Sequence, residues 1–149
     1  MSKLNLILGL LGISLGCALP KAAPTALIPY HQGPWEQTIG YSQSITAGNL
    51  IHVSGTVGAD ASGFPKTMES QMKLALATIE ATLKQQGSSL QDVVSERIYT
   101  TDIEALKRCQ DVRKQAYGGH LPAATWVEVR RLYEPEALLE IEVEAVRRR

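Results

Sequence analysis

Three glutamates near the end of the chain, Glu140, Glu142 and Glu144, have the spacing of one face of a β-strand. Residues 138–146 alternate apolar and polar side chains, which is the pattern of a strand with one buried face. The three carboxylates therefore share one face, and the apolar residues share the other. On an open sheet face these carboxylates are simply solvated. On a face covered by another subunit they are candidates for acid–base chemistry, and the spacing leaves both alternatives open.

Residues that could form a metal site or a nucleophilic centre are scattered. The two cysteines, Cys17 and Cys109, form no CxxC pair and have no histidine at metal-ligand spacing. The histidines, His31, His52 and His120, are not spaced for a metal or a catalytic triad. We therefore expect no metal site and no triad, and we expect Cys109 to be a buried, unreactive thiol on a helix.

The composition fits a small globular protein without a dedicated nucleic-acid surface. The chain has 149 residues, enough for one domain with a hydrophobic core. Its 15 lysines and arginines balance 15 aspartates and glutamates, whereas nucleic-acid binders usually have a basic excess. Aromatic residues make up only 5%, which argues against a surface that stacks bases. We therefore expect no nucleic-acid partner.

The N-terminus has the pattern of a signal peptide. Lys3 precedes an apolar run over residues 4–19, which is short and glycine-rich for a membrane-spanning helix. We predict a cleaved signal peptide over residues 1–19, with an uncleaved anchor as the alternative. The segment around Ser14 loosely resembles a lipoprotein cleavage box, although serine stands where leucine is expected, so lipidation at Cys17 is a second alternative.

The mature chain is then expected to have two parts. Residues 20–34 are rich in proline and predict a flexible lead-in. Residues 35–149 predict a single domain. This protein would be exported, to the periplasm or outside the cell, and would have no membrane span after cleavage.

The periodicity of the domain predicts strands and helices in a mixed order. Gly55 lies inside a predicted strand, where glycine marks a bulge or a close approach of the backbone. Thr67 is placed to cap the first helix. The predicted strands cover residues 39–46, 50–57, 92–100, 122–129 and 138–146, and the predicted helices cover residues 68–86 and 103–117.

This order predicts an α+β fold with both helices on one face of a mixed sheet. Each helix links neighbouring strands by a crossover of the same hand, which places the helices on the same side. The other face is left bare, and an apolar bare face is usually covered by another subunit. Self-association is therefore expected.

Five short motifs, in register, resemble the Rid family, also called the YjgF-like or reactive intermediate deaminase family. The resemblance covers about residues 35–146. The motifs are Gly40-Tyr41-Ser42-Gln43, Asn49-Leu50-Ile51-His52-Val53-Ser54-Gly55, Asp92-Val93-Val94 with Tyr99-Thr100-Thr101-Asp102, Gly118-Gly119-His120-Leu121-Pro122-Ala123, and Val127-Glu128-Val129 with Glu140-Ile141-Glu142.

The resemblance implies a chorismate-mutase-like fold and a homotrimer whose sheets line the inside, with clefts between subunits. In well-known members each cleft hydrolyses an enamine or imine to a 2-oxo acid and ammonia, as in 2-iminobutanoate/2-iminopropanoate deaminases. No metal or organic cofactor takes part. An arginine binds the substrate carboxylate, and a glutamate with backbone groups positions the attacking water.

The resemblance also implies roles for individual residues. Tyr41 matches the cleft tyrosine of the family, and Ser54 and Gly55 match its serine-glycine pair. Gln110 falls where many members have a cleft asparagine.

The water-positioning glutamate is matched best by Glu140. Glu142 is the alternative, because the preceding turn varies in length and both side chains point the same way. A purely structural hydrogen-bonding role for Glu140 also stays open.

The main departure from the family lies at Ala124, where deaminase members carry the carboxylate-binding arginine. A bidentate charge-assisted contact contributes about 1.5–3 kcal/mol, so its loss lowers affinity on the order of ten- to a hundred-fold. Arg130 is about 20 Å away along the strand and cannot replace it, whereas Arg97 on another strand could. Trp126 stands where smaller residues are usual, and we expect it either to narrow the cleft or to pack as a core residue.

The sequence is consistent with three candidate functions. The first is a hydrolase of enamines or imines with altered specificity, and the second is a trimer that binds a small molecule without catalysis. The third, ribonuclease or chaperone activity, is weakened by the zero net charge, because Arg147–Arg149 is only a short basic tail.

Overall fold

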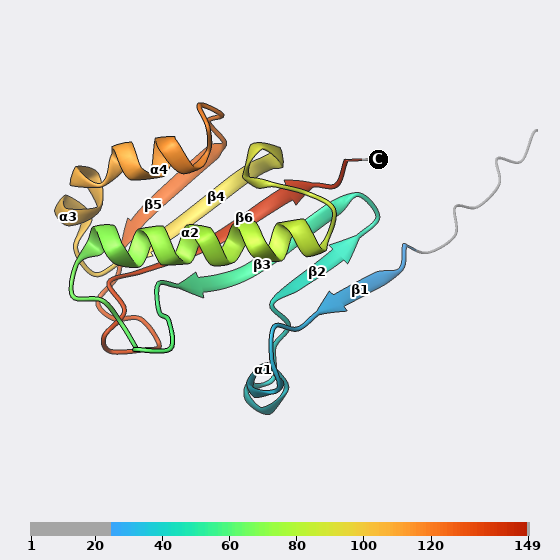
Figure 1. The fold of residues 1–149 in the computed structure, drawn as a ribbon, viewed down its shortest axis with the longest axis horizontal. Helices are drawn as coiled ribbons and strands as arrows, with labels where there is room; N and C mark the ends of the chain where they lie inside the picture. Colours follow the sequence, from blue (N-terminus) through green and yellow to red (C-terminus); the bar gives the residue numbers. More distant parts are fainter. Residues whose placement is uncertain (1–24, 149) are drawn as a thin grey trace, which may run out of the picture.

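The computed structural model describes residues 25–148, in which six strands form one sheet with helices packed on one face (Figure 1). The predicted signal peptide, including Cys17, lies outside the described residues. The strands are β1 (Leu27–Tyr30), β2 (Ser44–Ala47), β3 (Leu50–Val57), β4 (Val93–Thr100), β5 (Ala123–Glu128) and β6 (Leu139–Val146). The helices are α1 (Pro34–Ile39), α2 (Met68–Gln85), the 3₁₀ turn η1 (Leu90–Asp92), α3 (Ile103–Arg108) and α4 (Gln110–Ala116).

The sheet has the order β1-β2-β3-β6-β4-β5, so the last strand of the chain lies between β3 and β4. All neighbours are antiparallel except β4 and β5, which are parallel. Helix α2 connects β3 to β4, and α3 with α4 connects β4 to β5, all on one side of the sheet (Figure 1). The predicted α+β fold with a mixed sheet is confirmed.

The core lies between α2 and the central strands. The stripe predicted for this helix, Met72, Leu76, Ile79 and Leu83, is at most 2% exposed. Thr67 caps the helix by accepting a hydrogen bond from the backbone N–H of Ser70 at 3.2 Å, as predicted. This packing fixes the sheet from which the candidate site is built.

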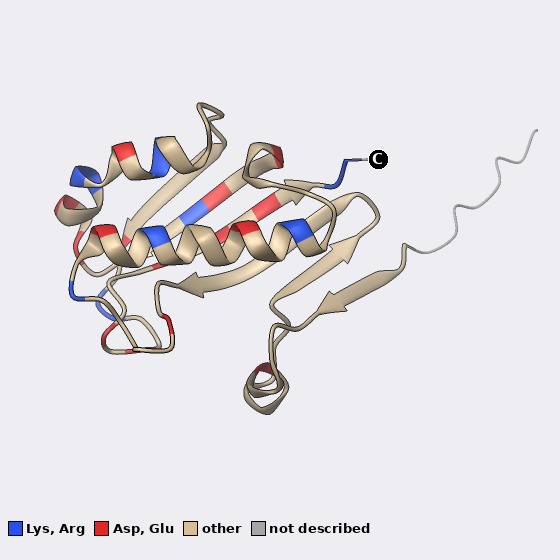
Figure 2. Ribbon diagram, in the orientation of Figure 1, with Lys and Arg blue, Asp and Glu red and all other residues tan. Residues whose placement is uncertain are grey.

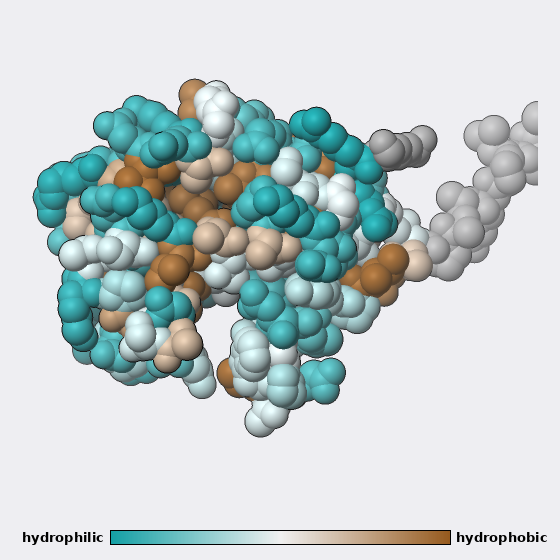
Figure 3. Space-filling model, viewed as in Figure 1, coloured by the Kyte–Doolittle hydropathy of each residue, from teal (hydrophilic) through white to brown (hydrophobic). Residues whose placement is uncertain are grey.

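The helix side of the molecule is largely hydrophilic, with apolar surface between α2 and α4 (Figure 3). This surface is a shallow groove lined by Val112 and Ala116 of α4 and Leu76 of α2, among others. Within the described residues, no helix is long and apolar enough to cross a membrane.

The uncovered face of the sheet is polar at its centre. Glu140, Glu142 and Glu144 are partly exposed on it, and the residues between them are buried on the helix side, as the alternation predicts. Arg97 and His52 lie on the same face, because they pair in register with Glu142 and Glu144. Figure 2 shows acidic and basic residues on β4 and acidic residues on β6. The expectation of an apolar bare face is therefore wrong at its centre.

Two predicted elements begin differently in the structure. The strand predicted over 39–46 begins only at Ser44, because Pro34 starts the short helix α1 and Gly40 ends it at a φ of 99°. The predicted flexible lead-in, residues 20–34, contains strand β1, which pairs with β2. The proline-rich composition suggested a flexible segment, but β1 is an edge strand, and edge strands tolerate proline.

The helix predicted over 103–117 is two helices. Cys109, with φ −95° and ψ 11°, lies between them as the C-cap of α3 and the N-cap of α4. Its side chain is buried in the core, as predicted, and burial raises the pKa of its thiol.

Candidate functional site

A bulge in β3 brings the backbone of this strand against a carboxylate of β6. Val53 pairs with Val143 and Thr56 pairs with Ile141, so two residues of β3, Ser54 and Gly55, oppose one residue of β6. A Cβ atom on Gly55 would lie 1.8 Å from Oε1 of Glu140. Glycine is therefore needed at this position if the Glu140 carboxylate is to lie here, which confirms the predicted close approach.

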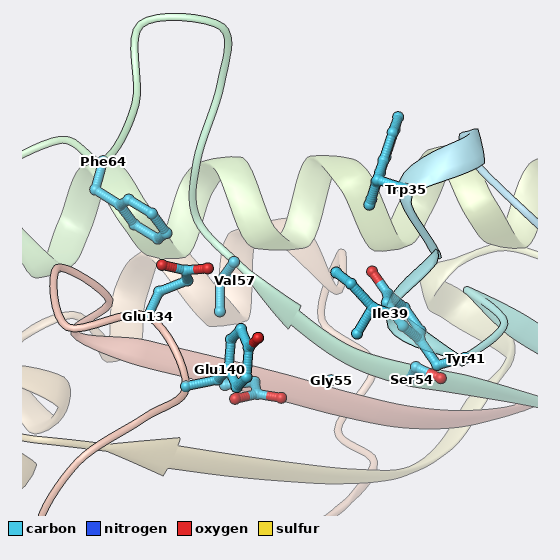
Figure 4. A pocket seen from close by; sticks show the side chains of 10 residues that line it. Trp35, Ile39, Tyr41, Ser54, Gly55, Val57, Phe64, Glu134 and Glu140 are labelled. Carbon is cyan, nitrogen blue, oxygen red and sulfur yellow. The ribbon is translucent and has the colours of Figure 1, made fainter. Parts of the chain in front are cut away.

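The carboxylate opens into a pocket of about 500 Å³ between α1 and two loops (Figure 4). The pocket is the notch between α1 and the neighbouring loops in Figure 3. The structure brings together four of the residues predicted for the site, Tyr41, Ser54, Gly55 and Glu140. The other lining residues are Trp35, Ile39, Val57, Phe64, Tyr133 and Glu134.

Glu140 lies in a partly desolvated environment beside a second carboxylate. Burial raises the pKa of its carboxyl above the ordinary value of 4.5, and the negative charge of Glu142 adds to the rise. Within the described residues Glu140 forms no ion pair. Glu142, by contrast, lies 3.7 Å from Nη1 of Arg97 and accepts a hydrogen bond from Tyr99 Oη at 3.5 Å. The geometry therefore favours Glu140 over Glu142 as the reactive carboxylate.

Tyr41 and Ser54 are held at the pocket by the chain that follows α1. Ser54 Oγ donates a hydrogen bond to the carbonyl of Ser42 at 2.7 Å, and Ser54 N–H donates to the carbonyl of Gln43 at 2.9 Å. Burial raises the pKa of the Tyr41 phenol, and the carboxylates of Glu36 and Glu140 add to the rise. The shift keeps the phenol in its ordinary neutral form, which can donate a hydrogen bond.

A buried carboxylate that sequence reasoning missed, Glu36, anchors helix α1. Its side chain is fully buried, accepts a hydrogen bond from the backbone N–H of Gln32 at 3.1 Å and lies 3.2 Å from His31 Nδ1. This anchor holds Trp35 and Ile39 at the mouth of the pocket. The sequence signal for this helix was Pro34 after Gly33, because proline is favoured at the first position of a helix.

Three predicted site residues do not reach this pocket within one chain. Ala124 and Trp126 lie on the edge strand β5 and pair with Glu96 and Ile98, so they face the helix side of the sheet. Gln110 begins α4, and its Nε2 is buried without a hydrogen-bond partner in the described part of the chain. Strand β4 lies between β5 and β6 and so separates Ala124 and Trp126 from Glu140, whereas Gln110 lies on a helix on the other side of the sheet.

Trp126 takes part in a buried polar network around Glu96. The Glu96 carboxylate, 1% exposed, accepts hydrogen bonds from Arg113 Nε at 2.7 Å, Tyr117 Oη at 2.6 Å and Trp126 Nε1 at 3.1 Å. The Arg113 guanidinium also lies 5.1 Å from the centre of the Tyr117 ring and 5.2 Å from that of Trp126. Trp126 is itself 38% exposed, so the expected role as a core residue is wrong; the ring packs at the edge of this network, and the narrowing of a cleft stays a prediction.

Arg97 does not provide a replacement for the arginine missing at position 124. Its Nη1 lies 3.7 Å from carboxylate oxygens of both Glu142 and Glu144 on the uncovered face. It is not among the residues that line the pocket. Among the described residues there is also no cluster of three or more side chains suited to a metal ion.

Comparison with known proteins agrees with these features. The family model described as Endoribonuclease L-PSP matches residues 34–147, which is most of the chain. The chain belongs to this family, which is also called the YjgF or Rid family. A RutC family protein of Pyrococcus abyssi is 36% identical over 113 residues, which cover 71% of this chain and 84% of that protein.

Solved structures of Rid-family proteins have the same fold. A member of the YjgF/YER057c/UK114 family from Mycobacterium tuberculosis is 36% identical with a TM-score of 0.73, covering 81% of this chain and 99% of that one. Escherichia coli TdcF, solved with bound serine, is 27% identical with a TM-score of 0.68, covering 80% and 93%. TdcF is named as a candidate reactive intermediate deaminase.

Proposed function

We propose that this Rid-family protein hydrolyses reactive enamines or imines to a carbonyl compound and ammonia in the Glu140 pocket. The observation that carries the proposal is the Glu140 carboxylate, held against the Gly55 bulge in a 500 Å³ pocket with its pKa raised by burial. A carboxylate of this kind can accept a proton from water and return it later in the same reaction. The name of the relative TdcF supports this reaction class.

The proposed reaction moves two protons from the water to the nitrogen. Glu140 accepts the first from the water that adds to the imine carbon and donates it to the nitrogen, which gives a carbinolamine. Glu140 then accepts the carbinolamine hydroxyl proton and donates it to the nitrogen as the carbon–nitrogen bond breaks. The neutral Tyr41 phenol and the Ser54 hydroxyl lie in the same pocket and orient the substrate. The carbinolamine collapses to the carbonyl product, and ammonia leaves.

We also propose that the protein is a homotrimer, exported after loss of residues 1–19. In a trimer, the edge strand β5 of a neighbouring copy would complete the pocket. Ala124, Trp126 and Gln110, which one chain leaves away from Glu140, would then line the cleft from the other side. Light scattering tests the assembly, and a stable monomer in solution would contradict it.

Ammonia release from freshly generated imines tests the activity. Glu140→Gln is expected to lower kcat/KM by about 10²–10⁴-fold, the range typical of general acid–base catalysis. Glu144→Gln is the matched control, because Glu144 lies on the same face of the same strand and outside the pocket. Equal activity of the two variants would contradict the role of Glu140.

Binding without catalysis is the second candidate, and Ala124 is the observation that favours it. A trimer that binds a metabolite without turnover would show a ligand-induced rise in melting temperature and no ammonia release across several imine classes. The ribonuclease activity in the family name has less support, because RNA phosphates need positive partners and the described lining residues include none.

A further inference from the structure

The walls of the Glu140 pocket are aromatic. Rings of Trp35, Tyr41 and Phe64 line it, and Val57 and Ile39 add apolar surface (Figure 4). Tyr133 is a further aromatic lining residue. Trp35 and Tyr133 are 52% and 75% exposed, so they form the open side of the pocket. Aromatic faces attract cations as well as apolar groups, because the ring quadrupole places negative charge above the ring.

The charged groups of the pocket are all acidic. Glu134 and Glu140 are its only charged lining residues among those the structure describes (Figure 4). Two further carboxylates lie close by: Glu36 near Tyr41 and Glu142 near Glu140, although Glu142 is paired with Arg97 and Glu36 lies 3.2 Å from His31 Nδ1.

No basic residue is among the described lining residues, and two basic residues on neighbouring segments are engaged elsewhere. Arg97 pairs with Glu142 and Glu144 on the uncovered face, and Lys66 lies 3.6 Å from the Glu136 carboxylate. In the part of the pocket that one chain lines, a ligand carboxylate would therefore meet carboxylates of the protein without a positive partner. Placing like charges together in a partly desolvated site is unfavourable, whereas a cation would be attracted.

We propose that the pocket takes a positively charged iminium ion derived from an apolar amine, without a carboxylate. This inference rests on the hydrolase function proposed above, and it names the substrate class. The reaction is R₂C=NH₂⁺ + H₂O → R₂C=O + NH₄⁺, in which water oxygen bonds to the iminium carbon and the carbon–nitrogen bond breaks. The apolar group R packs on the aromatic rings, and the iminium nitrogen lies between the two carboxylates.

The proposal is tested with two imines that differ only in the carboxylate. An L-amino-acid oxidase converts phenylalanine to the carboxylate-bearing imine, and an amine oxidase converts 2-phenylethylamine to the imine without it. The purified full-length protein is expected to release ammonia with a kcat/KM about tenfold or more higher for the second imine. A preference for the first imine would overturn the inference but leave the hydrolase function standing.

Glu134→Gln tests the charge of the pocket without touching the reactive carboxylate. This variant is expected to lower kcat/KM for the carboxylate-free imine several-fold and to reduce the ratio between the two imines. Glu136→Gln is the control, because Glu136 belongs to the same loop but lies outside the pocket and pairs with Lys66. An unchanged ratio in the Glu134 variant would count against the inference.

A binding measurement separates the two proposals. The cation 3-hydroxyphenyltrimethylammonium and the neutral 3-tert-butylphenol have nearly the same shape, so their affinities differ by the charge. Calorimetric or NMR titration is expected to show binding of the cation tighter by about fivefold or more. If neither imine is hydrolysed, the hydrolase function fails, and equal affinity for the two compounds would then overturn the cationic pocket as well.

Discussion

Gly55→Ala isolates the contact between the strand bulge and the reactive carboxylate. The new Cβ would lie 1.8 Å from Glu140 Oε1 and 2.7 Å from its Cδ, so the carboxylate must move by roughly 1 Å or more to reach ordinary van der Waals separation. The clashing atoms belong to the end of a flexible side chain, and Gly55 does not have a positive φ, so alanine fits the backbone. The variant is therefore expected to displace the carboxylate while the strand stays in place.

Gly55→Ala is expected to change the stability of the protein little and its activity strongly. A less favourable rotamer of Glu140 costs about 0.5–1.5 kcal/mol, and replacing glycine by alanine stabilises by about 0.4–1 kcal/mol through the unfolded chain. The free energy of unfolding should therefore change by about 1 kcal/mol or less. Activity should fall by about 10²-fold, because a shift of 1 Å in a catalytic group has an effect of this order.

Gly58→Ala provides the contrast. Its Cβ would lie 2.0 Å from the backbone oxygen of Gln71 in α2, which cannot swing away. This variant should be destabilised by about 1–3 kcal/mol or more. Urea unfolding and ammonia release are measured on both variants. Full activity in Gly55→Ala, or a loss of stability as large as in Gly58→Ala, would refute the reasoning.

Three further predictions concern buried charges. The raised pKa of Glu140 means that the folded protein binds its proton more tightly than the unfolded chain, so this group's contribution to stability is lost as pH rises above about 4.5. Glu140→Gln should flatten that part of the stability–pH curve measured by chemical unfolding, and an unchanged curve would contradict the shift. Arg113→Ala leaves Glu96 buried without its charged partner and should cost about 3–5 kcal/mol in urea unfolding, whereas a cost below about 1 kcal/mol would show that the pair is not buried in solution. Glu36→Ala should raise KM more than it lowers kcat, because it releases α1 at the pocket mouth, and hydrogen exchange should show faster opening of residues 31–41 if this is correct.

Elements that depend on short-range patterns are predictable from the sequence. The apolar stripe of α2, its cap at Thr67 and the alternation of β6 follow from neighbours a few residues apart, and the structure confirms them. Gly55 was identifiable because a glycine inside a strand usually marks a bulge or a close approach of the backbone. The resemblance to the Rid family placed Tyr41, Ser54 and Glu140 in one site, and the structure brings them together.

Features that depend on distant contacts were missed or misread. Glu96 looks like a surface residue of a strand, and only the packing of α4 places Arg113 beside it. The break at Cys109 interrupts a continuous apolar stripe, so helical periodicity does not reveal it. Phe64, Tyr133 and Glu134 belong to loops, so no periodic signal marked them as lining residues.

The sequence by itself determined the order of elements, the faces of the strands and the family, because these depend on side-chain spacing along a local backbone. Only the tertiary structure decided which carboxylate is free of an ion pair among the described residues, which loops close the pocket and on which face Ala124 and Trp126 lie. These properties depend on register and packing between segments far apart in the chain. The pKa of Glu140 depends on this packing, because burial and the neighbouring Glu142 carboxylate raise it.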